Sequence, residues 1–311
     1  MSAGRLALFL VDETNEFQRL LRGDAEEAAR RLGLEVETHF TGPSLSSQLG
    51  QLQTCLDSTP RPNAFLVMCV NDRGLQRVAR RAAKAGAHWI SLNQCEDDLQ
   101  TVRGEHPGQA ISTVCPDEIE TGRIQGRQFR RLLPDGGRIL YVLGGVRSIA
   151  ARDRQAGMQE ALAGSPLEVI PLEAGWTAEA GREAVLAWLR IAMRASRHVD
   201  LIGCQNDTIA QGARAAIEEA ARELGRPELR SVPLTGCDGS PGLGQAMVRA
   251  GELRATVVLP RATGPAVETI ARFLRTGALP PPVSLLKGHS FPPEEEILPI
   301  ALPAVTAGRT R

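Results

Sequence analysis

The sequence has few aromatic residues and no net charge. Phe, Trp and Tyr together make up 4% of its 311 residues, with three Trp and one Tyr. Lys plus Arg and Asp plus Glu number 36 each, so the formal net charge is zero. We therefore expect an aliphatic core. The neutral balance argues against a direct nucleic-acid partner, because nucleic-acid-binding proteins usually carry a basic footprint.

Long apolar runs are also missing. No run approaches the roughly 18 apolar residues of a membrane span. The first apolar run, Leu6–Val11, follows only five residues and is too short for the core of a signal peptide. The sequence as written predicts a soluble, unexported chain with no membrane span, although a trimmed export signal would leave the same pattern.

The cysteines form no recognisable pairs. None lies in a CxxC motif or near a histidine at zinc-finger spacing, and the six are Cys55, Cys69, Cys95, Cys115, Cys204 and Cys237. Several lie in or beside apolar runs, where free cysteine behaves as a small hydrophobic residue. We expect buried, reduced thiols, which favour the cytoplasm. No metal site and no cofactor are predicted.

Familiar catalytic motifs are absent as well. The sequence contains no GxSxG, no GxxxxGK phosphate loop and no HExxH. The glycines of the segment 239–244 have the wrong spacing for a dinucleotide fingerprint, and the five histidines fall mostly outside the predicted strand-end loops. We expect no catalytic residue. An enzyme remains the less favoured alternative, because a nucleophile and its base meet in space rather than in sequence.

Short apolar runs alternate with longer helical patterns along most of the chain, which predicts βα units around parallel sheets. The expected strands are Leu6–Val11, Leu34–Phe40, Ala64–Val70, Trp89–Leu92, Arg138–Leu143, Leu167–Leu172, Leu201–Cys204, Val232–Cys237 and Ala255–Leu259. The strands up to Leu92 and those from Arg138 onward form two series. Each series opens with a strand, a polar loop, a helix and an apolar strand, which predicts two similar α/β lobes. The segment Thr113–Asp117 is expected to link them, and the Pro-rich region after Pro280 suits loops or an edge strand.

Polar side chains follow the predicted strands, where open parallel sheets bind ligands. Those with hydrogen-bonding or aromatic groups include Asn15, Phe17, Gln18, Asn71, Asp72, Arg73, Asn93, Gln94, Arg154, Trp176, Gln205, Asn206, Asp207 and Asp238. Amide, carboxylate and guanidinium groups pair with vicinal hydroxyls, and an aromatic face covers the C–H side of a sugar ring. The set favours a polyhydroxylated ligand.

Each of these residues also has a structural interpretation. Asp207 with Thr208 could be a helix N-cap, and Asn71 with Asp72 could be a turn. Trp176 could belong to the core, and Arg154 could lie on a helix surface. Asp238 with Gly239 is, taken alone, an ordinary turn.

Four stretches in order carry a resemblance to a known family: 15–17 (Asn-Glu-Phe), 150–157 (Ala-Ala-Arg-Asp-Arg-Gln-Ala-Gly), 205–213 (Gln-Asn-Asp-Thr-Ile-Ala-Gln-Gly-Ala) and 236–241 (Gly-Cys-Asp-Gly-Ser-Pro). The chain resembles the type I periplasmic binding proteins, in particular the ribose-binding branch, which share their fold with the effector domains of LacI-type repressors. The resemblance extends from about Leu6 to about Ser290.

The resemblance implies two doubly wound parallel-sheet lobes joined by a three-crossing hinge, with ligand bound between them. The lobes would comprise residues 1–115 plus 260–289 and residues 116–259 plus 290–311, with crossings near 115–117, 259–260 and 290. The family's ligand contacts fall on Asn15, Phe17, Arg154, Trp176, Asn206 and Asp238. The arginine, amide and acidic groups would hold sugar hydroxyls, and the aromatic residues would sandwich the ring.

The chain departs from the family pattern at three places. Asn93-Gln94 stand where sugar binders usually carry Asp-Arg, Gln18 replaces a pocket Phe, and Leu259 replaces an expected Gln. The site would lose a charged pair in the first lobe, which puts a pentose ligand in doubt. We expect reversible binding of a sugar, polyol or other small polar ligand with hinge closure.

The protein would then be the solute-binding component of a membrane transporter or a sensor that acts on a signalling protein. The alternative is a cytosolic ligand-sensing regulatory protein of the LacI-effector type. Only five residues precede Leu6, so the sequence as written has no room for a helix-turn-helix there.

Overall fold

The computed structural model describes residues 4–70, 74–93, 99–145, 148–195 and 197–301. The chain forms two compact units. The first comprises Met1–Thr121, Val146–Arg154 and Val258–Gly288, and the second comprises Gly122–Gly145, Gln155–Val257 and His289–Arg311. This division groups the segment 146–154 with the first unit, whereas the family resemblance assigns it to the second lobe. The predicted lobe boundaries and the hinge stay predictions.

The first unit is built on a six-stranded sheet with the strand order β11-β5-β4-β3-β1-β2, and its registered pairs are parallel. The strands are β1 (Gly4–Leu10), β2 (Leu34–Phe40), β3 (Ala64–Val67), β4 (His88–Ser91), β5 (Ile111–Pro116) and β11 (Val283–Leu286). Most of the segment 113–117, expected to be a link, belongs to strand β5, which is buried along its whole length. Its short polar residues did not form the apolar run by which the other strands were predicted. The Pro-rich segment leads into β11, the edge strand expected there.

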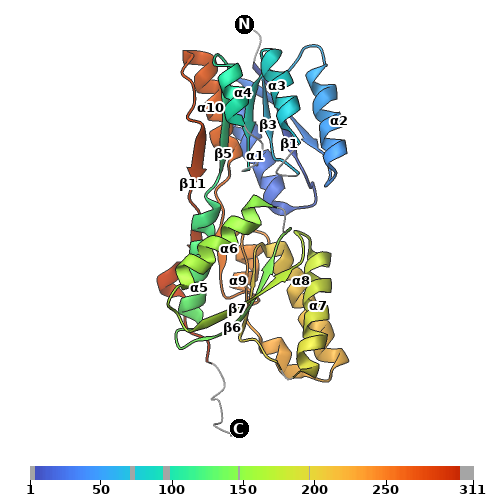
Figure 1. The fold of residues 1–311 in the computed structure, drawn as a ribbon, viewed down its shortest axis with the longest axis vertical. Coiled ribbons are helices and arrows are strands. Elements are labelled where there is room, and N and C mark those ends of the chain that lie inside the picture. Colours follow the sequence, from blue (N-terminus) through green and yellow to red (C-terminus); the bar gives the residue numbers. More distant parts are fainter. Residues whose placement is uncertain (1–3, 71–73, 94–98, 146–147, 196, 302–311) are drawn as a thin grey trace. The chain divides into compact units, whose positions relative to one another are not determined.

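Helices cover both faces of this sheet (Figure 1). They are α1 (Glu16–Leu32), α2 (Leu45–Leu56), α3 (Gln76–Lys84), α4 (Leu99–Glu105) and α10 (Thr263–Thr276). Alternate residues of β1 point to opposite faces: Leu6 and Leu8 pack with α1 and α10, whereas Ala7 and Phe9 pack with α2, α3 and α4. A strand buried on both faces must be apolar throughout, which is why 6–11 reads as a continuous apolar run.

The second unit repeats this plan around a four-stranded parallel sheet with the order β7-β6-β8-β9. Its strands are β6 (Gly137–Leu143), β7 (Leu167–Glu173), β8 (Leu201–Cys204) and β9 (Leu234–Thr235), and β10 (Thr256–Val258) pairs separately with β12 (His289–Phe291). The helices are α5 (Glu118–Leu132), α6 (Ile149–Leu162), α7 (Ala178–Arg194), α8 (Asp207–Glu223) and α9 (Gly244–Arg249), with short 3-10 turns at Pro227–Ser231 and Glu294–Glu296. The first turns of α5 and α6, residues 118–121 and 149–154, belong to the first unit.

Both sheets are doubly wound. In the first, the order reverses beside β1, and in the second it reverses beside β6. The α/β class with two parallel-sheet units is confirmed, and each sheet has the switch point at which ligands of such folds bind.

Most buried hydrophobic side chains are aliphatic, as expected, but the few aromatic residues are prominent among them. The five largest fully buried side chains are aromatic: Trp89, Tyr141, Phe9, Phe65 and Phe129. In the first unit, Phe9, Phe65 and Trp89 stack in a row across three adjacent strands, with ring centroids 6.1 Å apart. Aromatic residues are few in this sequence, but each buries a large apolar area. They therefore occupy central positions in the core despite their low number.

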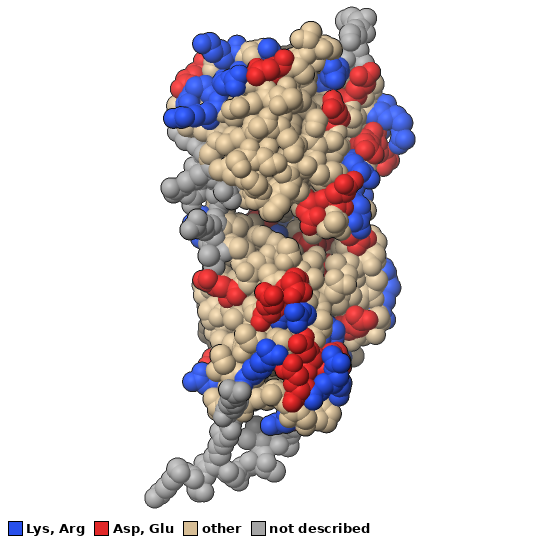
Figure 2. Space-filling model, turned by 90° about the vertical axis from the view of Figure 1, so that its right-hand side faces the viewer, with Lys and Arg blue, Asp and Glu red and all other residues tan. Residues whose placement is uncertain are grey.

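On the face shown in Figure 2, positive and negative residues lie side by side in several places. One broad uncharged area lies on the first unit, on the side where Figure 1 shows α2, and the sequence of α2 contains no charged residue. Five cysteines are buried and free, as predicted, and Cys95 lies outside the described residues. No helix among the described residues is long and apolar enough to cross a membrane.

Candidate functional site

In the first unit, the loop after β1 is shaped by amide side chains. Asn15 caps α1, with its side-chain oxygen accepting from the backbone N–H of Gln18 at 3.1 Å. The Oε1 atom of Gln18 accepts from the backbone N–H groups of Val11 and Asp12 at 2.8 and 3.0 Å. Phe17 is half-buried and packs against the core beneath α1. All three predicted residues therefore lie beside the switch point of this sheet.

Amides also hold the loops after β3 and β4. Asn93 bonds to the backbone of Cys69 in both directions, accepting at 2.7 Å and donating at 3.1 Å. Gln48, fully buried on α2, donates to the Met68 carbonyl at 2.9 Å and accepts from the Val70 N–H at 3.0 Å. Gln48 is a supporting residue that sequence reasoning missed, because a glutamine inside a helix carries no motif.

Arg154 forms a buried ion pair rather than lying on an exposed helix surface. Its Nε and Nη2 atoms donate to the two carboxylate oxygens of Glu118 at 2.6 and 3.1 Å, and both side chains are less than a tenth exposed. Such a bidentate pair fixes the plane of the guanidinium. Glu118 was not singled out from the sequence, because the two residues are 36 positions apart.

The neighbourhood of this pair is acidic. Burial, followed by the charge of Glu118, raises the pKa of Asp153. Burial and then the charges of Glu118 and Asp117 raise the pKa of the Cys115 thiol to about 12. Cys115 is thus a protonated, inert thiol, since reactivity requires the thiolate.

In the second unit, Asn206 and Trp176 are joined directly. Asn206 caps α8 by accepting from the Ile209 N–H at 2.6 Å, and its Nδ2 donates to the Trp176 carbonyl at 3.1 Å. The Trp176 ring lies against Gly144 so closely that any Cβ at position 144 would clash with it. Trp176 is partly buried against the core, so its structural interpretation is also supported.

A buried chain of hydrogen bonds supports the end of β6. The Tyr141 hydroxyl donates to Gln125 Oε1 at 2.6 Å, and Gln205 Nε2 contacts the same hydroxyl at 3.4 Å. Gln205 Oε1 accepts from the Gly144 N–H at 2.9 Å. The chain links α5, β6 and the loop after β8, so it fixes the position of the backbone that carries Gly144.

Asp207 is not the helix cap considered for it, because Asn206 occupies that position. Its carboxylate is 1% exposed and accepts from the Gly239 N–H and the Thr256 hydroxyl, each at 2.7 Å. Burial, followed by the charge of Asp238, raises its pKa. Asp238 itself is half-buried at the start of this turn, with a φ of 102°.

The structure therefore divides the predicted residues into two sets, one in each unit, and most of them follow the carboxyl ends of strands. Asn15, Phe17, Gln18 and Asn93 belong to the first unit, with Arg154 at its α6 segment; Trp176, Asn206 and Asp238 belong to the second. Gln94 and the segment 71–73 lie outside the described residues. Among the residues that the structure describes, no three His, Cys, Asp or Glu residues are grouped as a metal site would need.

Known proteins resemble the chain over most of its length. A ribose import binding protein of Escherichia coli is 26% identical over 278 residues, which cover 88% of this chain and 86% of the relative. A D-allose-binding periplasmic protein of the same organism is 26% identical over 259 residues, covering 82% and 79% of the two chains.

Solved structures share the fold. A periplasmic solute-binding protein of an Actinobacillus succinogenes ABC transporter, solved with D-allose, has a TM-score of 0.79 at 19% identity and covers 94% of this chain and 98% of its own. The Caulobacter myo-inositol-binding protein has a TM-score of 0.76 at 22% identity and covers 92% of each chain. The family described as the periplasmic binding protein domain matches residues 6–262. This chain belongs to that family, in its type I branch, as the four stretches in the sequence indicated.

Proposed function

We propose that this protein reversibly binds a sugar or polyol through polar and aromatic side chains at the carboxyl ends of its parallel strands. The proposed contacts are Asn15, Phe17, Gln18, Asn93, Gln94, Arg154, Trp176, Asn206 and Asp238. The observation that carries the proposal is that both doubly wound sheets place amide, carboxylate or aromatic groups at their switch points. Relatives named for ribose and allose support the ligand class.

The chemistry of these groups suits hydroxyl-rich ligands. Carboxylate and guanidinium groups make strong, directional hydrogen bonds to pairs of hydroxyls, and the indole of Trp176 offers a flat apolar face. Binding without a chemical step fits the relatives, which are named as binding proteins. The proposed partner besides the ligand is a membrane transporter or a signalling protein. The hinge closure expected from the resemblance stays a prediction.

A direct test is a thermal-shift screen followed by isothermal titration calorimetry with D-ribose, D-allose, myo-inositol and, as a non-sugar comparison, glutamate. A ligand that binds only the folded state raises the melting temperature. We expect at least one of the three polyhydroxylated probes to raise it and to bind with one-to-one stoichiometry. No shift with any of them would refute the proposed ligand class.

Site variants then test the residues. Asp238→Ala is expected to weaken binding at least tenfold, or about 1.4 kcal/mol. The same is expected of Arg154→Gln combined with Glu118→Gln, which removes the guanidinium without leaving a buried charge. A matched control is Arg138→Gln on β6, whose side chain pairs with Glu168 on the surface. Wild-type affinity in both site variants would reject the assigned site.

A further inference from the structure

We propose that Asp207 is a positioning residue that holds the backbone of Asp238 in its ligand-binding conformation. The inference rests on the proposed function, in which Asp238 contacts the ligand and Asp207 does not. It is carried by the hydrogen bonds, burial and packing around one carboxylate in the second unit.

The backbone at Asp238 is strained. Among the described residues it is the only one other than glycine with a positive φ, at 102°. Side chains with a Cβ rarely adopt this region, because holding one there strains the backbone. Surrounding contacts must therefore supply the restraint.

Three backbone hydrogen bonds hold the turn at Asp238. The Asp238 N–H donates to the Val257 carbonyl at 3.0 Å. The next N–H, that of Gly239, donates to Asp207 Oδ2 at 2.7 Å. The Ser240 backbone also donates to this carboxylate. Two successive backbone N–H groups thus donate to one carboxyl group, so the Asp207 side chain is well suited to hold this turn.

The Asp207 carboxyl group is itself held by hydrogen bonding and close packing. Thr256 on β10 donates its hydroxyl to Oδ1 at 2.7 Å. A Cβ at either Gly236 or Gly244 would clash with the Asp207 carboxylate, so both glycines leave room for it. Asp207 is also the first residue of α8, directly after the capping residue Asn206. One short segment thus positions two proposed ligand groups, Asn206 directly and Asp238 through its backbone.

Holding the turn with a buried carboxyl group costs free energy. Burying a carboxylate near a second one is unfavourable, and the raised pKa of Asp207 reflects burial first and the charge of Asp238 second. A neutral acceptor would close the turn at less cost. The hydrogen bonds that Asp207 accepts from Thr256, Gly239 and Ser240 offset part of this cost.

The test compares Asp207→Asn with Asp200→Asn. Asp200 is a matched control because its carboxylate also accepts a backbone N–H, that of Arg138 at 2.8 Å, but at the amino end of β6. The first readout is calorimetric affinity for D-ribose, D-allose and myo-inositol. The second is hydrogen exchange of individual backbone amides, measured by NMR.

We expect Asp207→Asn to weaken binding of the responsive probe at least tenfold and to speed exchange of the Gly239 amide at least tenfold. Exchange at Ile209, whose amide is capped by Asn206, should not change, which shows that α8 remains folded. Asp200→Asn should leave both the affinity and the Gly239 exchange unchanged. If Asp207→Asn does not fold, Thr256→Val, which removes one donor to the carboxylate, should shift both readouts in the same direction by a smaller factor.

Wild-type exchange at Gly239 in Asp207→Asn overturns the inference, whether or not affinity falls. Faster exchange with unchanged affinity also overturns it, because the turn would then not serve binding. If the wild-type protein binds none of the probes, the proposed function fails, and the exchange measurement alone still decides whether Asp207 restrains the turn.

Discussion

The two units follow one topology but stabilise their strand ends by different chemistry. In the first unit, neutral amides such as Gln48 and Asn93 bond to backbone groups, and one ion pair, Arg154 with Glu118, is buried. In the second unit, a buried carboxylate and the Tyr141–Gln205 chain do the same task, while most ion pairs lie on the surface. The two units therefore hold the loops at their strand ends by different groups, and we expect their stabilities to respond differently to mutation and pH.

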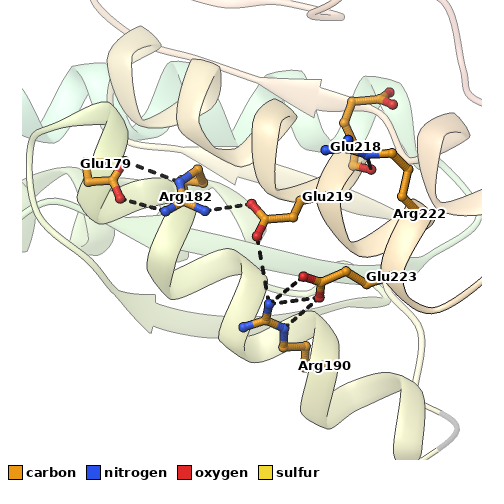
Figure 3. A network of polar contacts seen from close by, with 7 residues as sticks. All are labelled: Glu179, Arg182, Arg190, Glu218, Glu219, Arg222 and Glu223. Carbon is orange, nitrogen blue, oxygen red and sulfur yellow. Dashed lines mark hydrogen bonds and ion pairs between the residues drawn. The ribbon is translucent and has the colours of Figure 1, made fainter.

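The surface pairs of the second unit join α7 to α8. Arg182 bridges Glu179 and Glu219, and Arg190 bridges Glu219 and Glu223 (Figure 3). These side chains are between 29% and 64% exposed, so solvent weakens their attraction. Beneath them, the helices approach so closely that a Cβ at Gly212 would clash with the Ala178 carbonyl. We infer that close packing, not the ion pairs, sets the stability of this helix pair.

The largest effect is expected at the buried ion pair of the first unit. Glu118→Ala leaves the Arg154 charge buried without this partner and should lower the free energy of unfolding by about 3–5 kcal/mol. Replacing both residues, by Glu118→Leu with Arg154→Met, should restore most of that loss. Urea denaturation followed by circular dichroism measures both. A loss below about 1 kcal/mol in Glu118→Ala would show that the pair is not desolvated.

The next effect contrasts two helical glycines. Gly212→Ala on α8 should destabilise the protein by about 1–3 kcal/mol, because the methyl group has no space. Gly23→Ala on α1 should stabilise it by about 0.5–1 kcal/mol, because nothing lies near the added methyl and alanine favours the helix. Thermal or urea unfolding of the two variants should give opposite signs; equal signs would contradict the packing argument.

A third effect concerns pH. The folded protein binds the Asp207 proton more tightly than the unfolded chain, because burial raises the pKa of this group. Stability should therefore fall as the pH rises from about 3.9, the ordinary pKa of aspartate, through the raised value. The slope from one proton is at most about 1.4 kcal/mol per pH unit. Asp207→Asn should remove this component, which urea titrations at several pH values would reveal.

The smallest effect is expected on the surface of the second unit. Arg190→Ala should cost about 0.2–1 kcal/mol, since its side chain and that of Glu223 are 45% and 40% exposed. The loss should shrink further as salt is added, because screening weakens exposed pairs. Unfolding measured at low and high salt checks this. If Arg190→Ala lowered the free energy of unfolding by several kcal/mol at every salt concentration, this surface network would contribute as much to stability as the buried pair, contrary to our expectation.

The polar residues show where sequence reasoning reached its limit. Asn15, Asn206 and Asp238 follow apolar runs, so their placement at strand ends could be predicted from pattern alone. Glu118 and Gln48 could not, because their partners are 36 and 20 or more positions away and no local spacing marks them. Strand β5 was not among the predicted strands, because its Ser, Thr and Cys side chains are short and only partly apolar.

The sequence by itself determined the α/β class, the succession of most strands and helices, and the family. These depend on local apolar period and on short motifs, which act over one helix or strand. Only the tertiary structure decided that Arg154 pairs with Glu118, that Asn206 rather than Asp207 caps α8, and that the Asp207 carboxylate holds the turn at Gly239. Those outcomes depend on which distant segments meet and how much water their meeting excludes, and no local pattern encodes either.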